Sequence, residues 1–291
     1  MPTIRQPILV AVKLDHAAIA LVRQAGSIAR AQGVPLRIGH VLPELVLVHP
    51  LFPQLHVPEL AGQSQLEATA LDQLSDIATE ALGESAEETE LLLEHGTPQA
   101  GLRRMAESLR PGLIVIGAGD AGGKSSGVAG RIAQDTRCAV LIARRMTSGP
   151  IIAATDFSDP ALPAVLAGRA EALRRERSLY VINCFDLFPV PPMTKHFVES
   201  LPRAYSEGLR SASRAKLDAC AEAHAAKPLF REGHPSEVIM QAANELGADL
   251  VVVGTHGRSG VRRFALGSVA EDIMCAATCS VMVVPITDAL Q

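Results

Sequence analysis

A stretch rich in glycine and small residues has the composition of an anion-binding loop. Residues 254–268 read GTHGRSGVRRFALGS, after the expected buried strand DLVVV (249–253) and before the helical pattern 268–277. Glycine lets the backbone turn tightly and approach a ligand closely. Bare peptide N–H groups at a helix N-terminus attract anions, because the helix dipole is positive there. The stretch therefore predicts a phosphate site, in which Ser268 either caps the helix or donates its hydroxyl to a phosphate.

An acidic residue is expected at the same edge of the fold. Asp156 ends the apolar run of IIAATDF, and Gly254 ends the run DLVVVG. Open α/β sheets bind ligands at the carboxyl ends of their strands, so both residues should lie at one edge. A carboxylate in that place is an acceptor that suits the ribose or adenine of a nucleotide.

The chain repeats itself, and the repeat indicates two domains. ILVAVKLD ends at Asp15, and Asp156 follows 141 residues later; Val140 and Val281 in the last strands are also 141 apart. Between these two pairs of matching residues, the difference in residue number falls to 137, at Gly117 and Gly254. We expect the first half to lack four residues in its last helix, since four residues are close to one helical turn.

Each half alternates strand-like and helical patterns, which predicts an α/β fold. Runs such as LIVIG and LVVVG are apolar throughout, as in strands that helices cover on both faces. Strands that alternate with helices give right-handed crossovers and a parallel sheet. The 291 residues suffice for two domains. We therefore predict two doubly wound, five-stranded parallel-sheet domains, over residues 1–146 and 149–291, joined near the polar segment RMTSG.

The glycine pattern resembles a known signature. The pattern G-x2-G-x9-G-S, with an acid after the first strand, is similar to the ATP-binding motif of the universal stress protein family. The resemblance to the family occurs once in each half, and the two halves together span nearly the whole chain. It implies a Rossmann-like, adenine nucleotide α-hydrolase-like fold. It also implies that Asp156 contacts the adenosine end and that Cys184 stands where a family valine frames adenine. The nucleotide-binding residues that the resemblance implies are Ala154, Thr155, Asp156, Cys184, Gly254, Thr255, Gly257, Arg258, Gly267, Ser268 and Val269.

The first half departs from this pattern. Asp120 replaces the second signature glycine and Arg131 follows Gly130 in place of the serine, although Asp15 matches Asp156. A carboxylate repels a triphosphate, and an arginine at a helix start opposes the dipole. Asp120 and Arg131 could also pair and close the cleft. We therefore expect weak ATP binding or none in this half, and another ligand there stays open.

Composition excludes several other classes of protein. A net charge of −4, 3% aromatic residues and no tryptophan argue against a nucleic-acid partner, which needs a basic face and stacking surfaces. The five cysteines show no metal-ligand spacing. No signal peptide or membrane-spanning run is readable, so we expect a cytoplasmic protein without a membrane partner.

Three functions remain open from the sequence. The resemblance implies a regulatory, stress-response protein that holds ATP, with or without Mg²⁺, in the second half and is read by an unidentified protein partner. The second is an adenine-nucleotide-dependent enzyme, either a slow ATPase or an adenylating enzyme, although no catalytic residues stand out. The third is a structural module without a ligand. The last strands would be exposed edges, so we expect the halves to pair as an intramolecular pseudo-dimer, with a homodimer left open.

Overall fold

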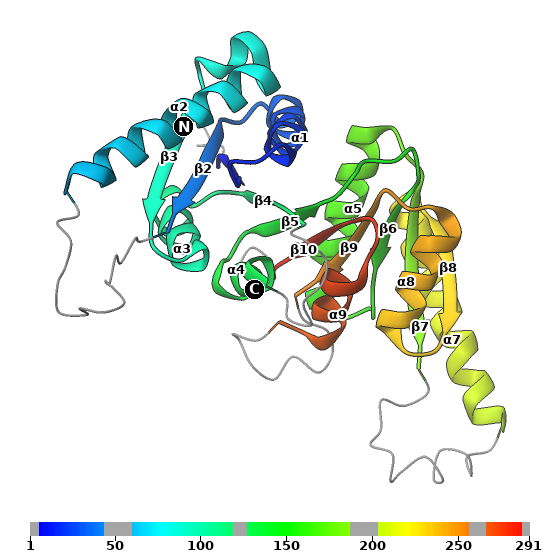
Figure 1. The fold of residues 1–291 in the computed structure, drawn as a ribbon. Coiled ribbons are helices and arrows are strands. Elements are labelled where there is room, and N and C mark those ends of the chain that lie inside the picture. Colours follow the sequence, from blue (N-terminus) through cyan, green and yellow to red (C-terminus); the bar gives the residue numbers. More distant parts are fainter. Residues whose placement is uncertain (1–5, 44–59, 119–126, 187–202, 256–265, 287–291) are drawn as a thin grey trace, which may run out of the picture. The chain divides into compact units, whose positions relative to one another are not determined.

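A computed structural model describes residues 6–43, 60–118, 127–186, 203–255 and 266–286 of the chain (Figure 1). The chain divides into two compact units. The first lies within Met1–Gly119 and Cys138–Ala143, and the second within Asp120–Arg137 and Arg144–Gln291. The predicted domain boundary stays a prediction, because helix α4 (Gly127–Asp135) groups with the second unit.

The first unit contains a sheet of five parallel strands in the order β3-β2-β1-β4-β5. The elements that follow one another along its chain are β1 (Ile8–Ala11), α1 (Ala17–Gln32), β2 (Leu36–Leu42), α2 (Leu60–Leu82), η1 (Gly83–Ala86), β3 (Glu90–His95), α3 (Pro98–Leu109), β4 (Leu113–Gly117) and β5 (Ala139–Ala143).

The second unit has the same topology, with its strands in the order β8-β7-β6-β9-β10. Its elements are β6 (Ile151–Ala154), η2 (Asp159–Ala161), α5 (Leu162–Arg175), β7 (Leu179–Phe185), α7 (Arg203–Ala223), β8 (Lys227–Glu232), α8 (Pro235–Leu246), β9 (Leu250–Gly254), α9 (Ser268–Ala276) and β10 (Ser280–Val284). The predicted α/β fold with five parallel strands per repeat is confirmed.

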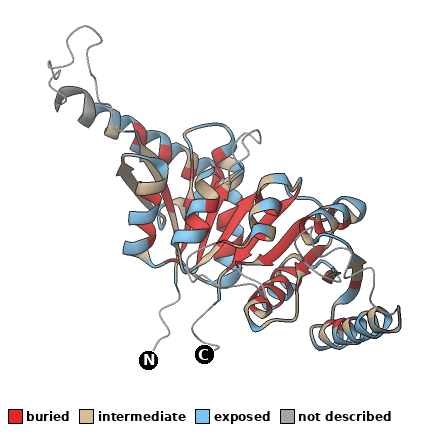
Figure 2. Ribbon diagram, turned by 90° about the horizontal axis from the view of Figure 1, so that it is seen from below, coloured by how far each residue is buried: buried red, intermediate tan, exposed pale blue. Residues whose placement is uncertain are grey.

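The strands form the cores, as Figure 2 shows by their red colour. In the second unit, β6, β9 and β10 are buried along almost their whole length. Asn183 of β7 contacts α7, whereas the next residue, Cys184, contacts α8. Since successive side chains of a strand point to opposite faces, α7 and α8 cover opposite faces of the sheet. This covering on both sides explains why the strand sequences are apolar throughout.

The helices begin and end where the sequence offers suitable residues. Pro98 and Pro235 each occupy the first turn of a helix, where the missing N–H costs nothing. Gly33 and Gly247 end α1 and α8 with φ values of 63° and 57°. Glycine adopts this left-handed conformation without the steric cost that a Cβ would bring.

The register of the strands matches the first half to the second differently from the match of residue types in the sequence. Ile8 pairs with Leu36, and Ile151 pairs with Leu179, so the first strands are offset by 143 residues. The next hydrogen bonds agree, since Val12 N donates to Gly39 O as Thr155 N donates to Ile182 O. Lys13 therefore occupies the place of Asp156. The predicted match of Asp15 with Asp156 is wrong, because it rested on residue type, whereas backbone pairing decides which residue leaves the strand first.

The four missing residues lie between the fourth strand and the last helix of the repeat, not in that helix. Helices α4 and α9 have nine residues each, with an offset of 141, whereas β4 and β9 are offset by 137. The predicted deletion in the helix is wrong. A surface loop can lose residues at little cost, whereas a shorter helix would lose a turn of packed surface. The segment 118–126 is thus four residues shorter than its counterpart 255–267.

This loop changes the interpretation of Arg131. Because α4 begins at Gly127, Arg131 lies within the helix, not at its start, and it does not correspond to Ser268. The predicted repulsion between Arg131 and the dipole at a helix start is therefore wrong. Gly130 is likewise an interior, buried residue of α4. The predicted pairing with Asp120 lies outside the described residues.

Candidate functional site

The candidate site lies where the strand order of the second unit reverses. Strand β6 has β7 on one side and β9 on the other. The chain leaves β6 for β7 through α5 and enters β9 through α8, so its direction across the sheet changes at β6 (Figure 1). Such switch points leave a crevice at the carboxyl ends of the strands, where ligands bind in open α/β sheets.

Asp156 leaves β6 in a tight turn held by side chains. Its Oδ1 accepts hydrogen bonds from Ser158 N, at 3.0 Å, and from the Ser158 hydroxyl. Thr155 Oγ1 accepts from Phe157 N at 3.0 Å. Phe157 has a φ of +63°, which is unusual for a residue with a Cβ and costs free energy. The side-chain hydrogen bonds thus hold a backbone conformation that this sequence would not otherwise prefer.

The two described ends of the glycine loop meet at the exit of β9. Thr255 N donates to Val284 O at 3.0 Å, and Thr255 O accepts from Gly267 N at 2.8 Å. Thr255 is buried. The structure therefore brings Gly254, Thr255 and Gly267 together although the chain leaves between them. Two predicted site residues within the loop, Gly257 and Arg258, lie outside the described residues.

Helix α9 begins directly after this closure. Gly267 is its N-cap, with extended backbone and no side-chain hydrogen bond to the helix, so the alternative in which Ser268 caps the helix is wrong. Ser268 is the first helical residue and is exposed. The first intrahelical bond runs from Glu271 N to Gly267 O, at 3.0 Å. The N–H groups of Ser268 and Val269 therefore have no acceptor within the helix and can take an anion.

Cys184 lies on the other side of Asp156, near the end of β7. Its Sγ lies 3.9 Å from Pro235 O, in the first turn of α8. Burial raises the pKa of the Cys184 thiol to about 12. At neutral pH this residue therefore gives the candidate site an uncharged, weakly polar surface. Strands β7 and β9 are separated by two strand spacings, about 10 Å.

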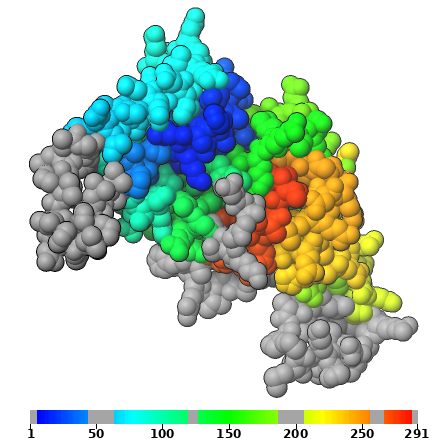
Figure 3. Space-filling model, in the orientation of Figure 1, coloured from blue at the N-terminus to red at the C-terminus, as the bar shows by residue number. Residues whose placement is uncertain are grey.

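A hydrogen-bonded chain joins α8 to α9. His234 Nδ1 lies 3.0 Å from Ser236 Oγ, which donates to Asp272 Oδ2 at 3.1 Å. Ser236 is only 3% exposed. The two helices pack against each other, and their gold and red surfaces are contiguous in Figure 3. This contact fixes the helix whose N-terminus faces the candidate site.

Two residues near Asp156 were missed by sequence reasoning. Asn183 Nδ2 donates to Thr155 O at 2.9 Å, and Asn183 Oδ1 accepts from Ser213 Oγ at 2.9 Å. The signal was present, since Asn183 is the one amide in the otherwise apolar strand LYVINCF. Its partner could not be found in the sequence, because Thr155 is 28 residues away.

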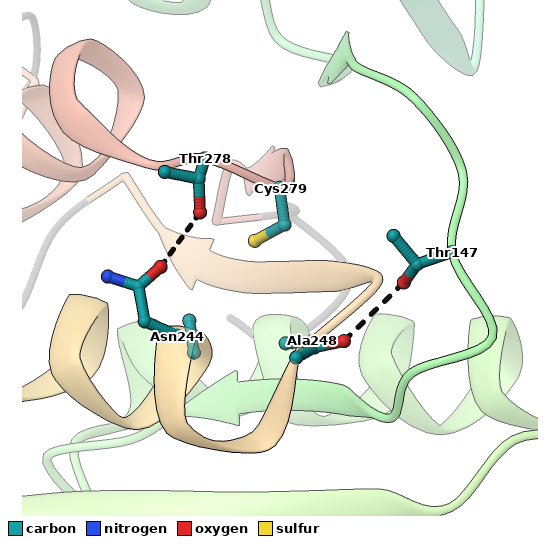
Figure 4. A pocket seen from close by; sticks show the side chains of 7 residues that line it. Thr147, Asn244, Ala248, Thr278 and Cys279 are labelled. Atoms are coloured by element: carbon teal, nitrogen blue, oxygen red, sulfur yellow. Dashed lines mark hydrogen bonds between the residues drawn. The ribbon is translucent and has the colours of Figure 1, made fainter.

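A cavity of about 190 Å³ lies elsewhere in the second unit (Figure 4). Its lining includes Ala248 and Cys279, which precede β9 and β10. Thr278 Oγ1 donates to Asn244 Oδ1 at 2.8 Å across it. The cavity is therefore at the amino ends of the strands, at the opposite edge from Asp156, and does not belong to the candidate site.

The described part of the chain contains no cluster of three His, Cys, Asp or Glu side chains that could hold a metal ion. Within the same residues, no helix combines the length and the apolar character needed to cross a membrane.

Fold and site together define a tandem, doubly wound α/β protein with a candidate anion site at one switch point. The model of the universal stress protein family matches residues 5–144 and 148–285. The chain belongs to the universal stress protein family.

Known proteins agree with this assignment. A universal stress protein of Thermus aquaticus is 32% identical over 136 residues, which cover 46% of this chain and 96% of that protein. The universal stress protein YxiE of Bacillus subtilis is 30% identical over 105 residues, or 36% of this chain and 71% of that protein. The crystal structure of a universal stress protein from Archaeoglobus fulgidus covers 98% of this chain and 97% of its own, with a TM-score of 0.69 at 16% identity, and shares the fold.

Proposed function

We propose that this protein is a regulatory protein of the stress response that binds ATP in its second unit. The observation that carries the proposal is the hydrogen bond from Gly267 N to Thr255 O. It sets the N-terminus of α9 at the exit of β9, the strand that pairs with β6. On this proposal, the peptide amides at the start of α9 and the carboxylate of Asp156 line one crevice at the carboxyl ends of β9 and β6.

The phosphates would lie at the start of α9. The amides of Ser268 and Val269 point out of the helix without an acceptor in it, and the dipole adds to their attraction for negative charge. The exposed Ser268 hydroxyl can donate to a phosphate oxygen. Gly254, Gly257 and Arg258 would complete this end. Whether Mg²⁺ accompanies the phosphates is decided by comparing ATP binding with Mg²⁺ and with EDTA.

The adenosine end would lie toward β7. Asp156 offers carboxylate oxygens to ribose hydroxyls, and Ala154 and Thr155 form the floor beside it. Cys184 would frame the base, since its buried, uncharged thiol suits an aromatic ring better than a charged group would.

The differences between the first unit and the second support a single nucleotide site per chain, in the second unit. Lys13 replaces the acid at the strand exit, and the loop before α4 is four residues shorter than the loop before α9. A cation in place of Asp156 cannot accept from ribose hydroxyls. A shorter loop offers fewer amides to a triphosphate.

Nucleotide occupancy tests the proposal. Purified protein is heated, and the released ligand is identified and quantified; ATP binding is then measured by calorimetry with Mg²⁺ and with EDTA. We expect adenine nucleotide from the wild type. Asp156→Lys, which copies the first unit, should lose at least tenfold in ATP affinity. Asp159→Lys is the matched control, because it makes the same charge change at an exposed position three residues away. Wild-type protein that neither carries nor binds adenine nucleotide would contradict the proposal.

We propose binding without a dedicated enzymatic activity. The test is the fate of bound ATP over hours at a protein concentration above the dissociation constant. We expect ATP to be recovered intact or converted more slowly than once per hour. Repeated turnover, or release of AMP and pyrophosphate, would favour the enzyme alternative.

A further inference from the structure

Asn183 occupies an unusual position beside the candidate site. It is a buried amide, 5% exposed, in an apolar strand. Its Nδ2 donates at 2.9 Å to the carbonyl of Thr155, which belongs to the peptide unit that connects Thr155 to Asp156. An unpaired amide would cost free energy in this interior, so the hydrogen bond accounts for the presence of a polar residue here.

The peptide that Asn183 holds begins the turn of Asp156. Two residues later, Phe157 takes a φ of +63°, a conformation that residues with a Cβ rarely adopt. A turn of this kind persists only where neighbouring groups fix it. Because the Thr155–Asp156 peptide determines where the Asp156 Cβ points, Asn183 acts on the direction of the carboxylate without being part of the turn.

Ser213 of α7 fixes the amide of Asn183. Its hydroxyl donates to Asn183 Oδ1 at 2.9 Å, which leaves Nδ2 to face Thr155 O. A hydroxyl can donate to the amide oxygen and a carbonyl can only accept, so the two bonds assign the same amide orientation. The direction of Asp156 is thus linked to α7 through two hydrogen bonds.

The first unit holds the same peptide with a different side chain. At the offset of 143 set by strand register, His40 corresponds to Asn183 and Val12 to Thr155. His40 Nδ1 lies 2.8 Å from Val12 O, and it must carry the hydrogen because a carbonyl only accepts. In α2, the buried residues Leu74 and Ala78 stand 143 before the buried Leu217 and Ala221 of α7, and at the same offset Ala70, also buried, stands where α7 has Ser213. The first unit thus combines a larger ring at the strand position with a smaller residue at the helix position, whereas the second unit combines a smaller amide with a hydroxyl.

We propose that Asn183 is a positioning residue of the nucleotide site. Its N–H donor sets the Thr155–Asp156 peptide, and thereby aims the Asp156 carboxylate at the adenosine end of the bound nucleotide. The inference rests on the proposed function. The proposed role requires an N–H donor at this position but not specifically an asparagine, because His40 makes the equivalent hydrogen bond in the first unit. It also confines the effect to the adenosine end, since the phosphates are held by α9.

The test compares three variants with two ligands, ATP and inorganic tripolyphosphate, by calorimetry. Asn183→Leu removes the donor at similar size. Asn183→His with Ser213→Ala restores a donor and copies the residues that the first unit has at the same offset, His40 and Ala70. Ser213→Ala alone leaves the amide without its orienting partner. Asn244→Leu, at an exposed amide at the other edge of the sheet, controls for general effects of losing an asparagine.

We expect Asn183→Leu to lose about tenfold in ATP affinity, the effect of one buried hydrogen bond, with tripolyphosphate affinity within about twofold of the wild type. The double variant should recover ATP affinity to within about threefold. Ser213→Ala should lose about threefold for ATP alone, and it keeps the test decisive if Asn183→Leu does not fold.

Three results would overturn the inference while wild-type protein binds ATP. These are unchanged ATP affinity in Asn183→Leu or Ser213→Ala, an equal loss for ATP and tripolyphosphate, and a double variant as weak as Asn183→Leu. Wild-type protein that binds no adenine nucleotide would instead overturn the proposed function, and the inference with it.

Discussion

At the scale of the residue, the candidate site depends on side chains that bond to the backbone near them. Thr155 Oγ1 accepts from the amide of Phe157, Asp156 Oδ1 accepts from the amide of Ser158, and Asn183 Nδ2 donates to the carbonyl of Thr155. Each of these bonds is modest in net free energy, about 1 kcal/mol. Together they fix a turn with an unfavourable φ, which is how a strand end can present a carboxylate in one direction.

Cys184 gives a prediction about pH. Burial raises the pKa of its thiol from 9.0 to about 12. Between these values the folded protein keeps a proton that the unfolded chain releases, so the stabilisation is complete below pH 9 and is lost as the pH rises toward 12. We expect the difference in free energy of unfolding between wild type and Cys184→Ala to shrink between pH 8 and pH 11, measured by urea denaturation about every half unit. A difference that is constant over this range would contradict the prediction.

At the scale of the element, a buried ion cluster secures the amino end of β9. Asp249, 1% exposed, pairs with Arg175 of α5, which also pairs with Glu171 at 2.9 Å. Asp249 Oδ1 accepts from Thr147 N at 2.6 Å, so the segment before β6 is tied to the same carboxylate. This segment lies so close that a Cβ at Gly149 would meet Gly247 O at 1.8 Å. The cluster thus joins a helix, a strand and the incoming chain.

Removal of Asp249 should therefore destabilise the second unit strongly. Asp249→Ala removes one of the two carboxylates that pair with the buried guanidinium of Arg175 and leaves Thr147 N without its acceptor, and we expect a loss of about 3 kcal/mol in the free energy of unfolding. Glu245→Ala is the matched control, because its pair with Arg231 is about half exposed and should contribute at most about 1 kcal/mol. Urea denaturation measures both. Equal losses in the two variants would show that the cluster does not stabilise the fold.

At the scale of the whole molecule, two units of one topology have unequal sites. The same strand order occurs twice, yet only the second unit combines an acid at the first strand exit with the longer loop before its last helix. A sheet core tolerates little change, since its strands are buried on both faces, whereas loops and strand exits can change without loss of the fold.

This inequality predicts one nucleotide per chain. We expect calorimetric titration with ATP to give a stoichiometry near one. Lys13→Asp should leave it at one, because restoring the acid does not restore the missing loop residues. The same experiment on Asp156→Lys should show the loss of at least tenfold in ATP affinity, without a second site appearing. A stoichiometry of two, in wild type or in Lys13→Asp, would contradict the assignment of a single site.

The sequence alone determined the fold class and the main parts of the candidate site. Runs such as LVVVG are apolar at every position, which is typical of strands covered by helices on both faces, and a parallel sheet places Asp156 and Gly254 at one edge. Glycines before a helical pattern predict an anion loop, and the structure brings Gly254 and Gly267 together. All of these are local patterns, so they can be found in the chain without knowledge of its contacts.

Only the tertiary structure decided the correspondence between the halves and the support of Asp156. Hydrogen-bond register, not residue type, assigned Lys13 to the place of Asp156, and helix bounds moved the four missing residues into a loop and Arg131 into the middle of α4. The bond from Asn183 to Thr155 joins residues that are far apart in the chain. Strand register and hydrogen bonds between distant residues depend on which strands lie side by side. Strands become neighbours only when the chain folds, so a local sequence pattern does not contain this information.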